Sequence, residues 1–161
     1  YLEFNLPLIE LADKLNKLIY KASPPDKYIT FLIALLNSES GEIEIVNAGH
    51  NPALLLRKDG TLEQIEAGGI GLGMLDLGIP YTSTNITLNA DDKLFLYTDG
   101  IPEAMNLAEE EYSETRMIDF FKDNSGQPPD GFIKNIVEDV KGHVGNAEQS
   151  DDITSMILKR C

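Results

Sequence analysis

Apolar positions at the start of the chain recur every three or four residues, which is the spacing of one face of an α-helix. The positions of this stripe are Leu8, Leu11, Ala12, Leu15, Leu18, Ile19 and Ala22. Pro7 stands in the first turn of the predicted helix, where its missing N–H is tolerated. Residues 23–25 (SPP) end it, because proline does not continue a helix. The pattern therefore predicts an amphipathic helix over residues 8–22.

Shorter apolar runs rich in β-branched residues predict strands. Residues 28–36 (YITFLIALL) are almost continuously apolar and too short for a typical helix, so they predict a buried strand. Ile43 and Ile45 alternate with Glu44, as in a half-buried strand. Further strands are predicted at residues 53–57, 61–65, 81–88, 94–97 and 153–158, with an Asp-Gly hairpin turn at residues 58–60.

Two more helices are predicted in the second half of the chain. Ser113 can cap a helix that runs to Lys122, and Pro129 opens another helix with an apolar stripe along residues 133–140. The predicted order is one helix, five or six strands, two helices and a final strand. Hairpin-connected strands followed by grouped helices favour an α+β fold with antiparallel pairing over βαβ repeats.

Composition places the chain among soluble globular domains. Its 161 residues are 42% hydrophobic, enough for one sizeable core. The formal charge of −14 repels phosphate backbones and anionic lipids, which argues against nucleic-acid and membrane-surface partners. No membrane-length apolar window or signal sequence is visible, and the single cysteine, Cys161, can close no internal disulfide. These features predict a cytoplasmic domain.

Acidic side chains follow one predicted strand and precede another. Asp99 comes directly after residues 94–97, and Asp151 and Asp152 come just before residues 153–158. A carboxylate at a strand end is held by the sheet and still reaches solvent, which suits a hard cation. If the two ends lie side by side, a divalent cation would relieve the repulsion between the carboxylates. The alternative interpretation is an ordinary Asp-Gly turn and an ordinary solvated loop.

Other candidate sites are weaker. His50 is either a proton donor, an anchoring hydrogen-bonder or a residue that shapes its loop. Two histidines and one terminal cysteine offer no ligand set for a zinc site. The glycine-rich residues 68–73 are followed by a strand pattern and lack the Lys-Ser/Thr of a phosphate loop. No G-x-S-x-G segment supports a serine hydrolase.

Three motifs occur in order along the chain: AGHNP at residues 48–52, LFLYTDGIPEA at 94–104 and SDDIT at 150–154. With them, the chain resembles the bacterial PPM-type (type 2C) serine/threonine phosphatases of the stage II sporulation and sigma-regulation branch (SpoIIE/RsbU-like). The resemblance runs from about Leu8 to the end of the chain. Each motif alone is weak, whereas their order and spacing together are specific.

The resemblance implies an α/β/β/α sandwich of two antiparallel sheets flanked by helices. It also implies a binuclear Mn²⁺ or Mg²⁺ site, with two cations per complete site, in which Asp99 and Asp151 are metal ligands. The residues expected to support these ligands are Asp152, Gly100, Thr98, Thr154, His50 and Asn51. Of these, Gly100 would let the backbone pass close to the metals, and the two threonines would orient the neighbouring carboxylates.

The implied activity is hydrolysis of phosphoserine or phosphothreonine by a water that the metals activate, with no catalytic side chain beyond that water. The first metal-binding motif of the family precedes the helix at which this chain begins. Residues 1–161 are therefore expected to be the C-terminal two-thirds of a single phosphatase domain, incomplete at the N-terminus and inactive alone. Residues 28–36 are then expected to lie at an exposed sheet edge or under a partner chain. The alternative is a non-catalytic, phosphatase-like regulatory module.

The partners implied by the resemblance belong to bacterial signal transduction. The expected substrate is a phosphorylated regulatory protein, such as an anti-sigma-factor antagonist. The longer protein is expected to carry an upstream sensor or receiver domain. No nucleic acid and no membrane contact are expected for this domain.

Overall fold

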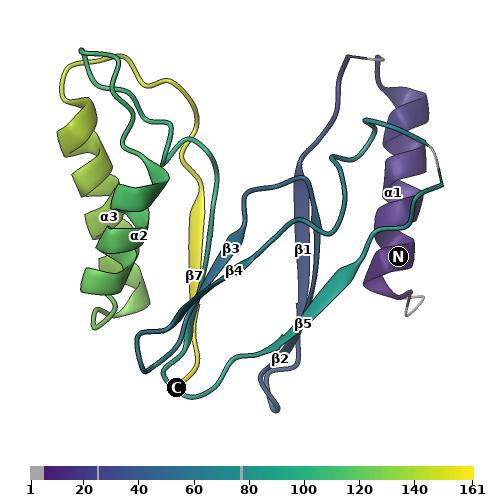
Figure 1. Cartoon of the computed structure of the whole chain (residues 1–161), viewed down its shortest axis with the longest axis horizontal. Coiled ribbons are helices and arrows are strands. Elements are labelled where there is room, and N and C mark those ends of the chain that lie inside the picture. The colour runs from purple at the N-terminus through teal and green to yellow at the C-terminus, as the bar shows by residue number, and fades with distance from the viewer. Residues whose placement is uncertain (1–5, 25, 77) are drawn as a thin grey trace. The chain divides into compact units, whose positions relative to one another are not determined.

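The computed structural model describes residues 6–24, 26–76 and 78–161. The elements along the chain are α1 (Leu8–Ala22), β1 (Phe31–Leu36), β2 (Glu42–Ala48), β3 (Ala53–Leu56), β4 (Leu62–Ile65), β5 (Ser83–Thr87), β6 (Lys93–Tyr97), α2 (Glu114–Asp123), α3 (Pro129–Val144) and β7 (Ser155–Lys159) (Figure 1). Within these ranges, the predicted order of one helix, six strands, two helices and a final strand is confirmed. The first helix ends at Ala22 as predicted, while Pro25 lies outside the described residues.

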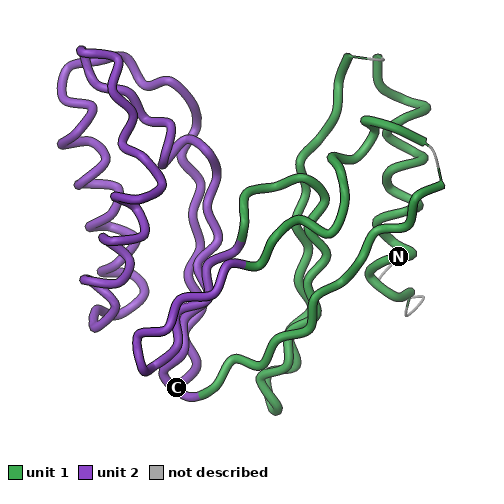
Figure 2. The backbone as a smooth tube through the Cα atoms, in the orientation of Figure 1, with its two compact units in different colours: residues 1–52, 65–89 green, residues 53–64, 90–161 purple. Residues whose placement is uncertain are grey.

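The chain divides into two compact units (Figure 2). Unit 1 comprises residues 1–52 and 65–89, and unit 2 comprises residues 53–64 and 90–161. One sheet has the strand order β1-β2-β5 and the other has the order β4-β3-β6-β7. The predicted α+β class, with two antiparallel sheets and flanking helices, is confirmed. In the described part of the chain, no helix has the length and apolar character needed to cross a bilayer.

Helix α1 covers the sheet of unit 1 with most of the stripe predicted from the sequence, whereas Leu18 and Ala22, which were predicted to belong to it, are exposed. Leu8 and Ala12 are buried against Val46 and Ala48 of β2, together with Leu72. Solvent-facing positions of the helix carry charges, including an ion pair between Glu10 and Lys14. Burial of one apolar face, rather than helix propensity, therefore holds α1 in place.

Strand β1 differs from its prediction in length and in burial. It begins at Phe31 rather than Tyr28, and its second half is exposed, with Leu35 at 56% and Leu36 at 42% of their full accessibility. Among the described residues β1 pairs only with β2, so it is an edge strand. The prediction of a buried strand is wrong because a continuous apolar run does not distinguish a central strand from an edge. The expectation of an exposed sheet edge, which followed from the family resemblance, is confirmed for β1.

The core of unit 2 is built around three phenylalanines. Phe95 of β6 lies 5.3 Å from Phe121 of α2 and 5.2 Å from Phe132 of α3, measured between ring centroids. The two helical rings lie 5.4 Å apart. All three side chains are fully buried. Large aromatic side chains contribute strongly to core energetics, so this cluster fixes both helices on the four-stranded sheet.

A polar network reinforces the packing of α2 against α3. The Tyr112 hydroxyl donates to Asp139 at 2.6 Å, and Arg116 donates to both oxygens of the same carboxylate at 3.0 and 3.2 Å. Arg116 also donates to Nδ1 of His143 at 3.2 Å, so Nε2 carries the hydrogen that is donated to the Glu110 carbonyl at 2.9 Å. Burial raises the pKa of Tyr112, which keeps its hydroxyl a donor.

The helix and turn signals of unit 2 are also confirmed. The Ser113 side chain accepts a hydrogen bond from the Arg116 N–H at 3.3 Å, as expected of an N-cap. The turn at residues 58–60 is closed by a hydrogen bond from the Arg57 N–H to the Thr61 carbonyl at 2.8 Å. Beside this turn, buried Asp92 accepts from the Arg57 guanidinium at 2.9 Å and from the Lys58 N–H at 3.0 Å.

The glycine-rich residues 68–73 pack against the loop of the AGHNP motif. The Gly68 N–H donates to the Asn47 carbonyl at 2.8 Å. Gly49 has φ of +70°, and a Cβ there would lie 2.6 Å from the Gly71 nitrogen, so only glycine suits this position. The segment leads into β5 rather than into a helix. It therefore lacks the helix N-terminus that a phosphate loop requires.

Candidate functional site

The two acidic motifs meet at one end of the four-stranded sheet. Strands β6 and β7 are antiparallel neighbours, and their register runs from Lys93 opposite Lys159 to Tyr97 opposite Ser155. The chain leaves β6 into residues 98–100 at the same end at which residues 150–154 enter β7. The sequence-based condition for a cation site, that these two strand ends lie side by side, is met.

Thr98 joins the two segments through main-chain groups. Its N–H donates to the Thr154 carbonyl at 3.0 Å, and its hydroxyl oxygen accepts from the Thr154 N–H at 3.0 Å. The same hydroxyl lies 3.1 Å from the Asp152 carbonyl, to which it can donate. The resemblance implied that both threonines orient carboxylates directly. The contacts of Thr98 run instead to the backbone, so it sets the path of the chain that carries the carboxylates.

Gly100 allows the two segments to touch. A Cβ at this position would lie 2.4 Å from the Asp152 carbonyl oxygen and 2.9 Å from its carbon. Carbon atoms do not approach a carbonyl oxygen so closely without a shift of the backbone. A side chain at position 100 would therefore separate the segment that carries Asp99 from the segment that carries Asp151 and Asp152.

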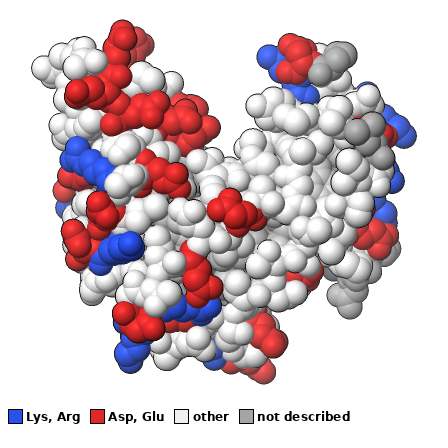
Figure 3. Space-filling model, in the orientation of Figure 1, with Lys and Arg blue, Asp and Glu red and all other residues white. Residues whose placement is uncertain are grey.

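The three acidic residues differ in exposure. Asp99 is half-buried, whereas Asp151 and Asp152 are exposed. The Asp152 N–H donates to Oδ1 of Asp151 at 2.7 Å, which orients that carboxylate. Figure 3 shows acidic side chains gathered on unit 2 towards the end at which β7 begins. This end of the sheet therefore has the strongly negative surface that attracts cations.

Sequence reasoning missed two residues that shape the loop before β7. The Gln149 side chain donates to the Asp151 carbonyl at 2.7 Å. The Ser150 hydroxyl donates to the Glu103 carbonyl at 3.4 Å, which ties this loop to the turn that follows β6. Ser150 opens the SDDIT motif and Gln149 lies directly before it, but no role was predicted for either residue.

The donor set suits a hard divalent cation but is incomplete. Carboxylate oxygens on two adjoining segments are the ligands that Mn²⁺ and Mg²⁺ prefer. The close approach at Gly100 keeps these segments together. Within residues 6–24, 26–76 and 78–161, however, no group of three or more His, Cys, Asp or Glu side chains is arranged to hold a metal. Asp99 and Asp151 can therefore supply part of a coordination shell.

His50 and Asn51 belong to unit 1, and their loop is organised by Asn47. The buried Asn47 side chain accepts from the His50 N–H at 2.8 Å and donates to the carbonyls of His50 and Asn51 at 3.1 and 3.3 Å. Asn47 was not recognised as important from the sequence, because an asparagine before Ala-Gly is also typical of a plain turn. The units are described separately, so the part that His50 and Asn51 take in a metal site stays a prediction.

Sequence comparison places the chain among known proteins. The family model of stage II sporulation protein E (SpoIIE) matches residues 1–161. The chain is 25% identical over 143 residues to the phosphoserine phosphatase RsbP of Bacillus subtilis, a match that covers 89% of this chain and 34% of RsbP. It spans about a fifth to a third of the length of the curated relatives that it matches.

Solved structures with the same fold include proteins of the same group. The RsbU and RsbW domains of Rv1364c from Mycobacterium tuberculosis match with a TM-score of 0.79 and 25% identity, over 99% of this chain and 44% of that one. The phosphatase domain of SpoIIE from Bacillus subtilis, presoaked with Mn, matches with a TM-score of 0.62 and 17% identity, over 92% of this chain and 73% of that one. With a family model that matches its whole length, this chain belongs to the stage II sporulation protein E (SpoIIE) family.

Proposed function

We propose that the chain is the larger part of a metal-dependent protein serine/threonine phosphatase domain. The observation that carries the proposal is the junction of β6 and β7, where Thr98 and Gly100 hold residues 98–100 against residues 152–154. Two motifs that lie some fifty residues apart in sequence meet there, and both bring carboxylates. Membership of the SpoIIE family and similarity to a phosphoserine phosphatase support the same activity.

In this proposal Asp99 and Asp151 bind divalent cations. When bound, Mn²⁺ or Mg²⁺ would supply the acidity that converts water to a nucleophile near neutral pH, together with positive charge that offsets the charge of a phosphoester. The Mn-presoaked relative supports a cation of this kind. We propose that further ligands come from residues outside the described chain, because Asp99 and Asp151 supply only part of a shell.

The remaining residues of the site would position the metal ligands and would not contact the reacting atoms. Thr98 and Gly100 keep the two ligand-bearing segments in contact through the backbone. The hydrogen bond from the Asp152 N–H to Oδ1 of Asp151 holds the Asp151 carboxylate in one orientation. His50 and Asn51 are proposed as supporting residues on the strength of the family resemblance.

The proposed substrate is a phosphoserine or phosphothreonine side chain on a regulatory protein. An anti-sigma-factor antagonist is a protein of this class. Similarity to RsbP and to a protein with RsbU and RsbW domains supports a role in sigma-factor regulation. We also propose that the longer protein carries an upstream sensor or receiver domain and that it acts in the cytoplasm.

The test uses the full-length protein that contains this chain and p-nitrophenyl phosphate as an artificial phosphomonoester. We expect Mn²⁺-dependent hydrolysis that falls at least ~100-fold in Asp99→Asn and in Asp151→Asn, because several kcal/mol of metal-derived stabilisation are removed. Asp119→Asn, which changes an exposed carboxylate on α2, is the matched control and should retain the activity of the unaltered protein. Undiminished hydrolysis in Asp99→Asn would refute the proposal. No hydrolysis by the unaltered protein would favour the non-catalytic module.

A further inference from the structure

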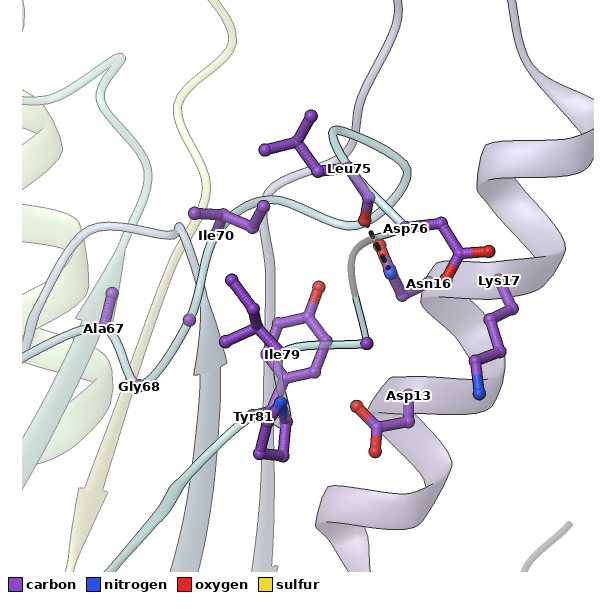
Figure 4. A pocket seen from close by; sticks show the side chains of 13 residues that line it. Asp13, Asn16, Lys17, Ala67, Gly68, Ile70, Leu75, Asp76, Ile79 and Tyr81 are labelled. Atoms are coloured by element: carbon purple, nitrogen blue, oxygen red, sulfur yellow. Dashed lines mark hydrogen bonds between the residues drawn. The ribbon is translucent and has the colours of Figure 1, made fainter.

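A pocket of about 310 Å³ lies in unit 1 between α1 and the segment of residues 67–81 (Figure 4). It is separate from the β6–β7 junction, because every residue that lines it belongs to unit 1. At ~30 Å³ per water molecule, this volume would hold about ten waters, which places it at the small end of ligand-binding sites. The pocket is therefore large enough for a compact organic molecule.

The pocket contains a buried polar group that the fold does not satisfy. Tyr81 is 4% exposed, and its hydroxyl has no hydrogen-bond partner among the described residues. Its ring lies against Gly69, where a Cβ would be 2.3 Å from the nearest ring carbon. In Figure 4 the hydroxyl points along the pocket towards Asn16 and Leu75. A buried hydroxyl without a partner is destabilising, so an acceptor brought by a ligand would gain a full hydrogen bond.

The Tyr81 hydroxyl keeps its hydrogen at neutral pH, so it can donate a hydrogen bond to an acceptor on such a ligand. Burial and the nearby charge of Asp13 both raise the pKa of Tyr81, which keeps the phenol protonated. The hydroxyl has almost no exposed surface. Access for a ligand would require a rotamer change of Leu75 or Ile79, which are 46% and 71% exposed.

The walls of the pocket are apolar and partly pre-formed. Ile70, Leu75 and Ile79 present exposed aliphatic side chains to it. Asn16 fixes the distance between the helix and the loop, because its side chain donates to the Leu75 carbonyl at 2.9 Å and accepts from the Gly73 N–H at 2.8 Å. A largely apolar cavity with a few convergent polar groups is the usual composition of a small-molecule site.

Charge around the pocket selects against anions. Asp13 and Asp76 line it together with a single cation, Lys17, and the whole chain carries a formal charge of −14. An anionic ligand would be repelled by this field, whereas a neutral ligand would not. Carboxamide hydrogens could in addition be accepted by the carboxylates at the rim.

We propose that this pocket is a binding site for a small, uncharged, mainly apolar molecule with a carbonyl oxygen, which accepts the hydrogen bond of the Tyr81 hydroxyl. Ligand binding bridges α1 and the segment of residues 67–81, so it stabilises unit 1. The proposal is independent of the phosphatase activity, because none of the residues involved belongs to the β6–β7 junction.

The test titrates benzamide into the full-length protein and follows backbone amide resonances by NMR. We expect saturable shifts at residues 13–17, 67–76 and 78–81, with a dissociation constant in the millimolar range, as befits a ligand of this size. Tyr81→Phe should weaken binding about 2- to 10-fold through loss of one hydrogen bond. Benzoate, which has the same shape and a negative charge, should bind more weakly than benzamide.

Two further variants separate binding from folding. Ile79→Ala shortens an exposed wall residue, so it should weaken benzamide binding without unfolding the protein. Leu18→Ala changes an exposed residue of α1 outside the pocket and should leave binding unaltered. Absence of saturable shifts, shifts centred on other residues, or equal affinity in Tyr81→Phe would each overturn the proposal.

Discussion

Unit 2 and unit 1 differ in how completely their sheets are covered. In unit 2, two helices pack on the four-stranded sheet through a buried aromatic cluster, and a hydrogen-bonded network joins the helices. In unit 1, a single helix packs on the three-stranded sheet, one edge strand carries exposed leucines, and a pocket lies beside the helix. The acidic motifs lie in unit 2, and a rigid support of this kind would suit the metal-ligand role proposed for them.

This difference implies that the two units respond differently to substitution. Removal of buried side chains in unit 2 should cost much stability, and changes at the β6–β7 junction should act on the proposed cation site. Edge residues of unit 1 should tolerate change, because much of their surface is already exposed to water.

The largest expected effect is a loss of stability from the aromatic cluster. Phe121→Ala should lower the free energy of unfolding by about 3–5 kcal/mol, because it leaves a cavity among fully buried side chains. Leu36→Ala, at the exposed end of β1, should lower it by less than ~1 kcal/mol. Urea unfolding monitored by circular dichroism measures both values. If both variants lost the same free energy of unfolding, the difference in packing between the two units would be contradicted.

Next in size is the steric effect at the β6–β7 junction. Gly100→Ala should lower the free energy of unfolding by about 1–3 kcal/mol, because the added Cβ meets the Asp152 carbonyl at 2.4 Å. Gly142→Ala is the matched control: its Cβ would meet nothing within 4 Å, and it should stabilise α3 by about 0.5–1 kcal/mol. If both variants were stabilised in urea titrations, the close approach at Gly100 would be ruled out.

A smaller effect is expected from the polar network between the helices of unit 2. Tyr112→Phe removes the hydrogen bond to Asp139 but leaves that carboxylate paired with Arg116, so the loss should be about 1 kcal/mol. Tyr20→Phe, at a half-exposed position of α1, should leave stability within ~0.5 kcal/mol of the unaltered protein. Thermal unfolding of both variants compares the two losses, and an unaltered melting temperature in Tyr112→Phe would contradict the role of the network.

The smallest effect concerns acid titration of an exposed carboxylate. Lys58 and Lys159 pair with Asp91 and lower its pKa below the ordinary value of 3.8. Because the pKa is depressed in the folded state, these pairs stabilise the protein above pH 3.8, and the contribution is lost as the pH falls through the lowered value. Asp91→Asn keeps a residue that tolerates the positive φ of this position. The variant should be slightly less stable at pH 7, and this deficit should shrink as the pH falls below 3.8. A deficit that does not change with pH would exclude the ion pairs.

Most of the fold could be predicted because its signals are local. The Ser113 cap and the proline at the start of α3 depend on neighbouring residues and are confirmed. The stripe of α1 is confirmed except at Leu18 and Ala22, which are exposed. The exposure of β1 could not be predicted from its composition, since an apolar run does not reveal whether a strand has neighbours on both sides. His143 likewise gave no signal, because its partners lie 27 and 33 residues away.

The two candidate sites also differ in whether the sequence carries a signal for them. The junction of β6 and β7 could be predicted, because two recognisable motifs flank two strands and antiparallel pairing brings their ends together. The pocket beside α1 had no such signal. It depends on Asn16, whose contacts lie 57 and 59 residues away, and on a tyrosine whose missing partner becomes evident only from the packed structure.

The central claim, that the β6–β7 junction binds a divalent cation, is tested most directly by calorimetric titration of Mn²⁺ into the full-length protein. The account predicts saturable binding in the unaltered protein and in Asp119→Asn, and at least ~10-fold weaker binding in Asp99→Asn and Asp151→Asn. Unchanged Mn²⁺ affinity in both of these variants would contradict it.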